Sequence, residues 1–180
     1  MALIRDRNID VLFDAETLAA RNDALAIDIA KNGHDNLLVI AVLKGSFIFA
    51  ADLVRSMHKA GMSPEIEFIT LSSYGADTTS SGTVRVVRDI ETDVAGRNVL
   101  LIDDILESGR TISFAKNLML ERGAASAEIA ILLDKTGKRV ADITAEYVGF
   151  ECPDYFVVGY GMDVAHAFRE LPFVGVVAED

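Results

Sequence analysis

The sequence predicts an α/β fold in which helices flank a parallel twisted sheet. Three short segments, residues 37–43, 98–103 and 128–133, are strongly apolar, as strands buried on both faces of a sheet are. Helical segments of about a dozen residues alternate with such strands, which is the pattern of a parallel sheet. Because ligands bind such sheets at the carboxyl ends of the strands, the residues that follow these three segments are the first candidates for a site.

Two helices are predicted around the first buried strand. Asp14 is a typical N-cap for a helix that runs to about Lys31, and Gly33 is a typical helix end. The second helix is expected over residues 47–59. Its apolar side chains at helical spacing are Phe47, Ala50, Ala51 and Val54.

The rest of the chain supplies further strands and one more helix. A helix over residues 111–122 connects the second buried strand to the third. Shorter strands are expected at residues 65–71, 84–88, 147–150, 156–158 and 174–177. No repeat, proline-rich linker or block of like charge divides the chain, so we expect a single domain over residues 1–180.

Composition limits the classes of protein to which the chain can belong. Of the 180 residues 51% are hydrophobic, and 28 Asp and Glu against 17 Lys and Arg give a net charge of −11. This composition is that of a globular protein and excludes disordered and low-complexity classes. The acidic balance argues against binding along a nucleic-acid backbone, so no nucleic-acid partner is expected. A small anionic ligand would need local cations, backbone amides or a metal ion.

A cytoplasmic protein with no membrane partner is expected. The longest strongly apolar run, residues 37–43, is far shorter than the ~18–20 residues of a membrane-spanning helix. Arg5 and Asp6 interrupt the apolar start of the chain, so no signal-peptide core is expected. The single cysteine, Cys152, cannot form an internal disulfide, which fits a reducing compartment.

The segment NVLLIDDILESGRT, residues 98–111, carries the clearest chemistry. A buried strand delivers Asp103 and Asp104 to its carboxyl end, and a turn with Gly109 then opens a helix. Free backbone N–H groups at the helix start, beside the Ser108 and Thr111 hydroxyls, suit a phosphate, and the two carboxylates suit the hydroxyls of an adjoining ribose. The alternative is a helix start whose acidic residues only offset the helix dipole.

This segment resembles the phosphoribosyl-pyrophosphate signature of type I phosphoribosyltransferases. Further motifs resemble those of the hypoxanthine-guanine phosphoribosyltransferases and occur in the order of that family: LKGS (43–46), LLDK (132–135), PDYFVVGYGMD (153–163) and RELP (169–172). The similarity spans about residues 39–177. It implies the type I phosphoribosyltransferase fold, with a core over about residues 35–150 and a small hood, built from both chain ends, over a purine site.

The resemblance implies a reaction of purine salvage. Phosphoribosyl pyrophosphate and hypoxanthine or guanine would give IMP or GMP and pyrophosphate, by displacement at the anomeric carbon of the ribose. The departing pyrophosphate carries dense negative charge, which a protein of net charge −11 could hardly hold without a metal. The cofactor implied is Mg²⁺, and the partners are these small-molecule substrates.

The resemblance also implies which residues bind phosphoribosyl pyrophosphate: Lys44, Gly45, Ser73, Tyr74, Asp103, Asp104, Ile105, Leu106, Ser108, Gly109, Arg110, Thr111 and Arg169. It implies a cis peptide bond after Leu43 and a lid over residues 73–83. For these two segments the alternatives are a helix-entry turn with Ser46 as N-cap and an ordinary mobile loop.

Glu107 matches the family's catalytic carboxylate, which exchanges a proton with the imidazole-ring nitrogen of the purine. Most members have Asp at this position, and the alternative role for Glu107 is an acid in the first turn of a helix.

Lys135 matches the lysine that donates to the six-position oxygen of the base. An ammonium only donates, so it favours an oxo group over the amino group of adenine. The alternative is a solvated lysine in a polar turn.

Three more residues complete the implied purine and metal sites. Phe156 matches an aromatic residue that stacks on the purine, and the backbone of Val157 would read the edge of the base. For Phe156 alone, packing in the core is the competing interpretation. Asp163 is expected both at the purine site and, with Asp103, as a magnesium ligand, since Mg²⁺ is usually held by one or two carboxylates, substrate oxygens and waters.

Two other functions stay open. The enzyme could prefer another base, and although Lys135 disfavours adenine, nothing excludes xanthine. A protein of the same fold could instead be a non-catalytic regulator that binds nucleotides or RNA. The acidic balance and the complete set of implied site residues argue against a regulator. The resemblance also implies a homodimer or homotetramer.

Overall fold

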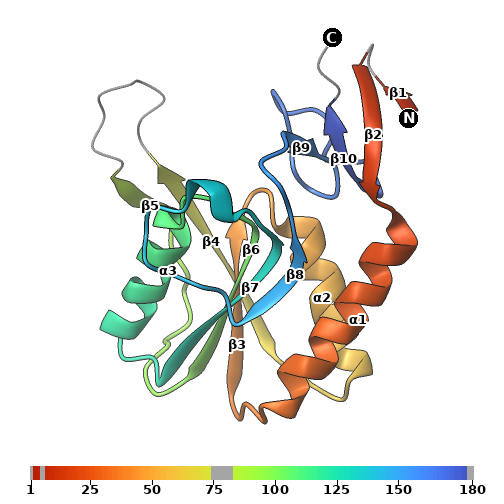
Figure 1. Ribbon diagram of the computed structural model, residues 1–180. Coiled ribbons are helices and arrows are strands. Elements are labelled where there is room, and N and C mark those ends of the chain that lie inside the picture. The colour runs from red at the N-terminus through yellow and green to blue at the C-terminus, as the bar shows by residue number, and fades with distance from the viewer. Residues whose placement is uncertain (1, 5–6, 74–82, 178–180) are drawn as a thin grey trace.

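A six-stranded sheet with the order β5-β4-β3-β6-β7-β8 forms the centre of the molecule. The computed structural model describes residues 2–4, 7–73 and 83–177 (Figure 1). All strands of this sheet are parallel except the edge strand β5, which confirms the predicted fold class. Their bounds are β3 (Leu37–Leu43), β4 (Glu65–Ser73), β5 (Val84–Arg88), β6 (Asn98–Leu106), β7 (Ser126–Asp134) and β8 (Tyr147–Glu151).

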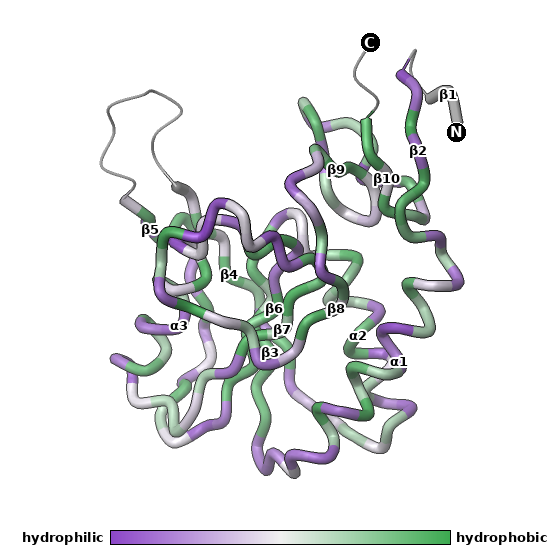
Figure 2. Tube along the Cα trace, in the orientation of Figure 1, coloured by the Kyte–Doolittle hydropathy of each residue, from purple (hydrophilic) through white to green (hydrophobic). Residues whose placement is uncertain are grey.

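Helices cover both faces of the sheet. One face packs against α1 (Ala15–Lys31) and α2 (Phe47–Lys59), and the other against α3 (Arg110–Glu121) (Figure 1). The central strands are the most apolar part of the chain (Figure 2), and in β3 every residue except Leu43 is fully buried. As predicted, Asp14 caps α1, because its carboxylate accepts the Thr17 N–H at 2.8 Å.

Two details differ from the sequence prediction. Strand β6 continues to Leu106 instead of ending at residue 103, because it pairs with β7 as far as the Leu106–Asp134 register. In α2 the buried face is centred on Phe49, Leu53 and Met57, whereas Phe47 is 40% exposed. Of the other residues expected at helical spacing, Ala50 is buried and Val54 packs against the core, so only Phe47 and Ala51 lie off the buried face.

The two ends of the chain meet in a second sheet. This four-stranded antiparallel sheet has the order β1-β2-β10-β9. It lies at the end of the molecule where the parallel strands finish (Figure 1). Ile9, Val158, Phe168 and Leu171 form its own small core. The bounds are β1 (Ala2–Ile4), β2 (Arg7–Phe13), β9 (Val157–Val158) and β10 (Val174–Val177).

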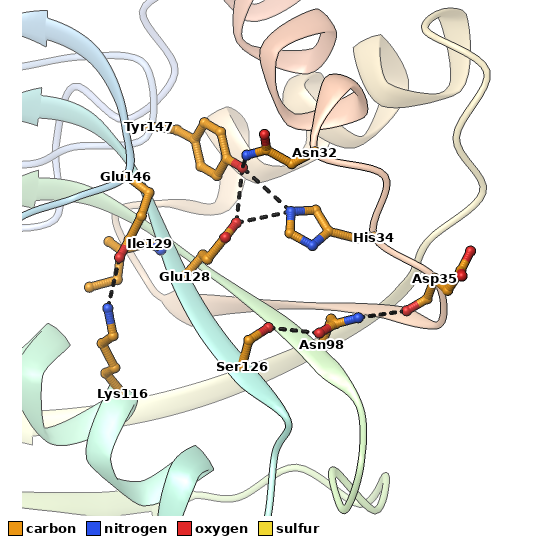
Figure 3. Close-up of polar contacts among 10 residues, drawn as sticks. All are labelled: Asn32, His34, Asp35, Asn98, Lys116, Ser126, Glu128, Ile129, Glu146 and Tyr147. Atoms are coloured by element: carbon orange, nitrogen blue, oxygen red, sulfur yellow. Dashed lines mark hydrogen bonds and ion pairs between the residues drawn. The ribbon is translucent and has the colours of Figure 1, made fainter.

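Polar side chains fasten the opposite end of the central sheet (Figure 3). Asn32, just after α1, donates to the Tyr147 hydroxyl at 2.5 Å, and that hydroxyl donates to the Glu128 carboxylate at 2.9 Å. His34 lies 3.0 Å from the same carboxylate. Burial raises the pKa of Tyr147 to about 12, so the hydroxyl stays a donor at neutral pH. None of the predicted site residues lies in this cluster.

No helix within the described residues is both long and apolar enough to cross a membrane.

The buried face of α2 can be tested with two phenylalanines. Phe49→Ala removes a fully buried ring and is expected to lower the free energy of unfolding by about 3–5 kcal/mol. Phe47→Ala, at a partly exposed position two residues away, is expected to lower it by less than about 1 kcal/mol. Denaturant unfolding of both variants measures the difference, and equal losses would contradict the observed orientation of α2.

Candidate active site

Asp103 and Asp104 lie side by side near the end of β6. The Asp103 carboxylate accepts the N–H of Asp104 at 3.0 Å, and the Asp104 carboxylate accepts the N–H of Ile105 at 2.9 Å. Burial, and then the neighbouring charge of Asp104, raise the pKa of Asp103 well above its usual range. Leu106, the last residue of the strand, packs its side chain into the core, so only its backbone is available to a ligand.

The turn between β6 and α3 borders a cavity of 310 Å³. Gly109 precedes α3 with a φ of 79°, a left-handed conformation that glycine adopts without strain. Gly109 has no side chain to cap α3, and only a long 3.4 Å hydrogen bond joins the Arg110 N–H to the Ser108 hydroxyl. Backbone N–H groups at a helix start are a ready site for an anion. The predicted phosphate residues that line this cavity are Lys44, Gly45, Asp103, Asp104, Ile105, Leu106, Ser108, Gly109 and Thr111. Arg110 is exposed and is not among its lining residues.

The loop after β3 closes over the Asp104 carboxylate. The peptide bond between Leu43 and Lys44 is cis, as the resemblance implied. A Cβ added to Gly45 would overlap the Asp104 carboxylate, so any other residue here would displace the Asp104 side chain. Ser46 is the N-cap residue of α2, as the alternative for this segment had it, but its side chain does not cap the helix, because its hydroxyl donates to the Val42 carbonyl at 2.6 Å.

A second cavity of 640 Å³ adjoins the first, and Lys44, Gly45, Asp104, Ile105 and Glu107 line both. It contains all the residues predicted at the purine and metal sites except Asp103: Lys135, Phe156, Val157 and Asp163, together with Arg169. The wall also includes Met162, from the 153–163 motif, and four residues that the motifs did not indicate: Thr70, Leu71, Ser72 and Val87. Their signal is only their place near the ends of β4 and β5.

Lys135 is a buried cation in this second cavity. It is 6% exposed, and its ammonium donates to the Tyr155 carbonyl at 2.6 Å. The Glu107 carboxylate lies 3.8 Å from the same ammonium. The alternative of a solvated turn lysine is therefore wrong. Glu107 itself is 43% exposed and also has Lys138 at 4.0 Å.

Phe156 lies on the surface of the second cavity and not in the core. Its side chain is 60% exposed, so the core-packing interpretation is wrong. The next residue, Val157, is buried and belongs to β9, which pairs with β10. The exposed ring of Phe156, just before β9, thus lines the same cavity as the buried Lys135, an arrangement suited to a flat ligand with a hydrogen-bond acceptor on its edge.

Asp163 and Arg169 form an ion pair at the far side of the second cavity. The Arg169 guanidinium lies 2.6 Å from the Asp163 carboxylate and also donates to the Gly161 carbonyl at 2.6 Å. The described residues contain no cluster of three or more His, Cys, Asp or Glu that could hold a metal by itself. Asp103 lines the first cavity and Asp163 the second. Each offers carboxylate oxygens, the ligand type that Mg²⁺ takes together with substrate phosphates and waters.

Part of the predicted lid lies outside the described residues. Ser73 is the last residue of β4 and pairs with Val84 of β5. Tyr74 and the rest of the segment to residue 82 are not described. The lid over residues 73–83 therefore stays a prediction.

Tyr160 is a residue that the motifs contained but that received no role. Its hydroxyl donates to Asp52 of α2 at 2.7 Å and accepts from Asn22 of α1 at 2.8 Å. Next to it, Gly161 packs so closely on the Gly45 carbonyl that a Cβ would overlap it. Tyr160 thus fastens the loop that carries Asp163 to both helices. In the sequence, only its position between Gly159 and Gly161 marked Tyr160 as unusual.

Known proteins share both the sequence and the fold of this chain. Residues 8–165 match the phosphoribosyl transferase domain family. The hypoxanthine-guanine phosphoribosyltransferase of Bacillus subtilis is 43% identical over 93% of this chain and 92% of its own length. The chain belongs to this phosphoribosyltransferase family. The hypoxanthine phosphoribosyltransferase of Haemophilus influenzae is 39% identical over 97% of this chain and 98% of its own length.

Solved structures of phosphoribosyltransferases agree with this assignment. The Trypanosoma cruzi hypoxanthine phosphoribosyl transferase superposes with a TM-score of 0.91 at 34% identity and covers 97% of this chain and 94% of its own. The resemblance predicted from the motifs is confirmed, and the protein is an enzyme of the hypoxanthine-guanine phosphoribosyltransferase type.

Replacement of the buried Asp103 is expected to stabilise this phosphoribosyltransferase without ligands. A carboxyl whose pKa is raised by folding destabilises the fold progressively as pH rises from about 4, the unfolded value, through the folded pKa. Asp103→Asn keeps an acceptor for the Asp104 N–H but cannot ionise. Its melting temperature should equal that of the wild type near pH 4 and exceed it at pH 7.5, whereas a difference that does not change with pH would contradict this account.

Proposed function

We propose that this phosphoribosyltransferase converts hypoxanthine or guanine and phosphoribosyl pyrophosphate to IMP or GMP and pyrophosphate, by displacement at the anomeric carbon. The observation that carries the proposal is the buried Lys135 ammonium beside the exposed Phe156 ring, in a cavity continuous with the turn that opens α3. The first cavity suits the phosphate and ribose, and the second suits the base and the pyrophosphate.

The 5′-phosphate binds at the turn after β6. Ser108, Gly109 and Thr111 supply backbone N–H groups and hydroxyls at the start of α3, where an anion is favoured. Asp103 and Asp104 accept hydrogen bonds from the ribose hydroxyls. Ile105 and Leu106 contribute backbone to the same wall. Arg110 stays a predicted contact outside the first cavity.

The purine stacks on Phe156 and is read at its edge. One of the three Lys135 N–H donors is used by the Tyr155 carbonyl, which leaves two for the six-position oxygen of the base. The amino group of adenine would present a donor to this donor, so adenine is rejected. The backbone of Val157, held in β9, lies next to Phe156 and would contact the base edge.

Glu107 exchanges a proton with the imidazole-ring nitrogen of the purine as the bond to the ribose forms. Its carboxylate lies between the two cavities, because Glu107 lines both. Lys135 at 3.8 Å and Lys138 at 4.0 Å hold the carboxylate on the base side. The extra methylene of Glu relative to Asp changes its reach but not its chemistry.

Lys44, Gly45 and Arg169 hold the pyrophosphate. Asp103 and Asp163 would hold Mg²⁺, which when bound neutralises part of the charge of the departing pyrophosphate. Asp163 also borders the purine subsite. A lid with Ser73 and Tyr74 would exclude water from the oxocarbenium-like centre.

Several wider properties belong to the proposal as predictions. They are a single domain over residues 1–180 with the chain-end sheet as a hood over the purine, a homodimer or homotetramer, and a cytoplasmic location. No nucleic-acid or membrane partner is expected.

Initial rates with phosphoribosyl pyrophosphate and each of four bases test the function. Pyrophosphate release is expected with hypoxanthine and guanine, is expected to be negligible with adenine, and should stop when EDTA removes the metal. Turnover with xanthine alone would contradict the base assignment and keep the reaction class. No turnover with any base, in protein shown to be folded by circular dichroism, would contradict the function and favour a nucleotide-binding regulator.

Two variants at position 107 test the catalytic role. Glu107→Gln removes the proton acceptor and is expected to lower kcat by about 10²–10⁴-fold, with a nearly unchanged KM for phosphoribosyl pyrophosphate. Glu107→Asp keeps the carboxylate and is expected to retain turnover, so it serves as the matched control. Steady-state kinetics measure both, and wild-type kcat in Glu107→Gln would remove Glu107 from the mechanism.

A further inference from the structure

Three consecutive carbonyl groups in the turn after β6 are hydrogen-bonded by a segment that no motif indicated. This segment, residues 139–141, is called the strap below. Its Arg139 guanidinium donates to the Glu107 carbonyl at 3.1 Å and to the Leu106 carbonyl at 3.3 Å. The backbone N–H groups of Val140 and Ala141 both donate to the Ser108 carbonyl at 3.0 Å. The strap therefore holds the turn by donating hydrogen bonds to its carbonyl oxygens.

The position of these carbonyls determines where the N–H groups of the turn point. In a planar trans peptide the C=O of one residue and the N–H of the next point in opposite directions. Leu43–Lys44 is the only cis bond found among the described residues, so the peptides of the turn are trans. With the carbonyls of residues 106–108 directed to the strap, the N–H groups of Glu107, Ser108 and Gly109 point away from it. These three residues line the 310 Å³ cavity.

Several contacts fix the position of the Arg139 side chain. The side chain is 18% exposed, and the guanidinium forms an ion pair with Asp134 at the end of β7. It also donates to the Ile143 carbonyl at 2.7 Å. A planar guanidinium can satisfy several acceptors in fixed directions, which an ammonium cannot do.

The strap also packs against the one residue of the turn that needs a left-handed backbone. A Cβ on Gly109 would lie 2.7 Å from Ile143 and 3.2 Å from the Arg139 side chain. Apolar contact and hydrogen bonds therefore fix the same turn from the same side.

We propose that Arg139 is a positioning residue for the phosphate subsite. Its guanidinium holds the Leu106 and Glu107 carbonyl oxygens behind the turn, and the strap backbone next to it holds the Ser108 carbonyl. Acceptors are thereby kept away from a bound anion, and N–H donors face the 5′-phosphate. A carbonyl turned toward the cavity would repel the phosphate that an N–H attracts. The inference rests on the proposed function, because it takes the 310 Å³ cavity to be the phosphate subsite.

The test compares Arg139→Met with a matched control, Arg122→Met. Arg122 also forms a two-bond ion pair with a carboxylate, at 2.6 and 2.8 Å from Asp89, but it lies just beyond the far end of α3. Arg139→Met is expected to raise the KM for phosphoribosyl pyrophosphate and the Kd of IMP by about 10–100-fold, the effect of losing a charged hydrogen bond. The KM for hypoxanthine, which carries no phosphate, should stay within about twofold of the wild-type value in Arg139→Met. In Arg122→Met, the KM for phosphoribosyl pyrophosphate, the KM for hypoxanthine and the Kd of IMP should all stay within about twofold.

Three measurements decide whether Arg139 positions the phosphate subsite or only stabilises the fold: calorimetry with IMP, steady-state kinetics and melting temperatures. If folded Arg139→Met binds IMP as the wild type does, or if the KM values for both substrates rise equally, the proposal is overturned. Should Arg139→Met not fold, Arg139→Lys decides, because it keeps the charge but not the planar fork, and an unchanged Kd for IMP would overturn the proposal. Wild-type protein that neither turns over nor binds IMP would instead contradict the proposed function.

Discussion

The parallel pairing of β6 with β3 on one side and β7 on the other is the constraint on which the site depends. Parallel strands that start in register also finish together, so the loop after β3, the paired carboxylates of β6 and Lys135 after β7 meet at one edge. The contact is tight enough that Gly45 has no room for a Cβ beside Asp104. Local sequence supplies the chemical groups, but strand pairing sets the distances between them.

Charge is the second constraint, because a protein of net charge −11 binds a substrate rich in phosphate. The site meets this need locally. Lys44, Lys135 and Arg169 converge on the larger cavity, and backbone N–H groups serve the smaller one. The buried Asp103 is unfavourable in the absence of a cation, as its raised pKa indicates.

Most elements, and many of the residues that line the two cavities, were predictable from sequence, because buried parallel strands and family motifs are local signals. Positions that depend on tertiary packing were not. In α2 the spacing included the buried Ala50 but also the exposed Phe47, since several sides of the helix are apolar and only the neighbouring elements select Phe49 over Phe47. Tyr160 contacts partners 108 and 138 residues away. Arg139 reaches carbonyls 32 and 33 residues away in addition to its near partners, so no local pattern could reveal these distant contacts.

A crystal structure of the protein with IMP tests the central claim most directly, namely that the two adjoining cavities are one active site. The account predicts the 5′-phosphate at Ser108–Thr111, the base stacked on Phe156, and its six-position oxygen within hydrogen-bond distance of the Lys135 ammonium. A phosphate bound elsewhere, or a base that leaves Lys135 and Phe156 without contact, would contradict it.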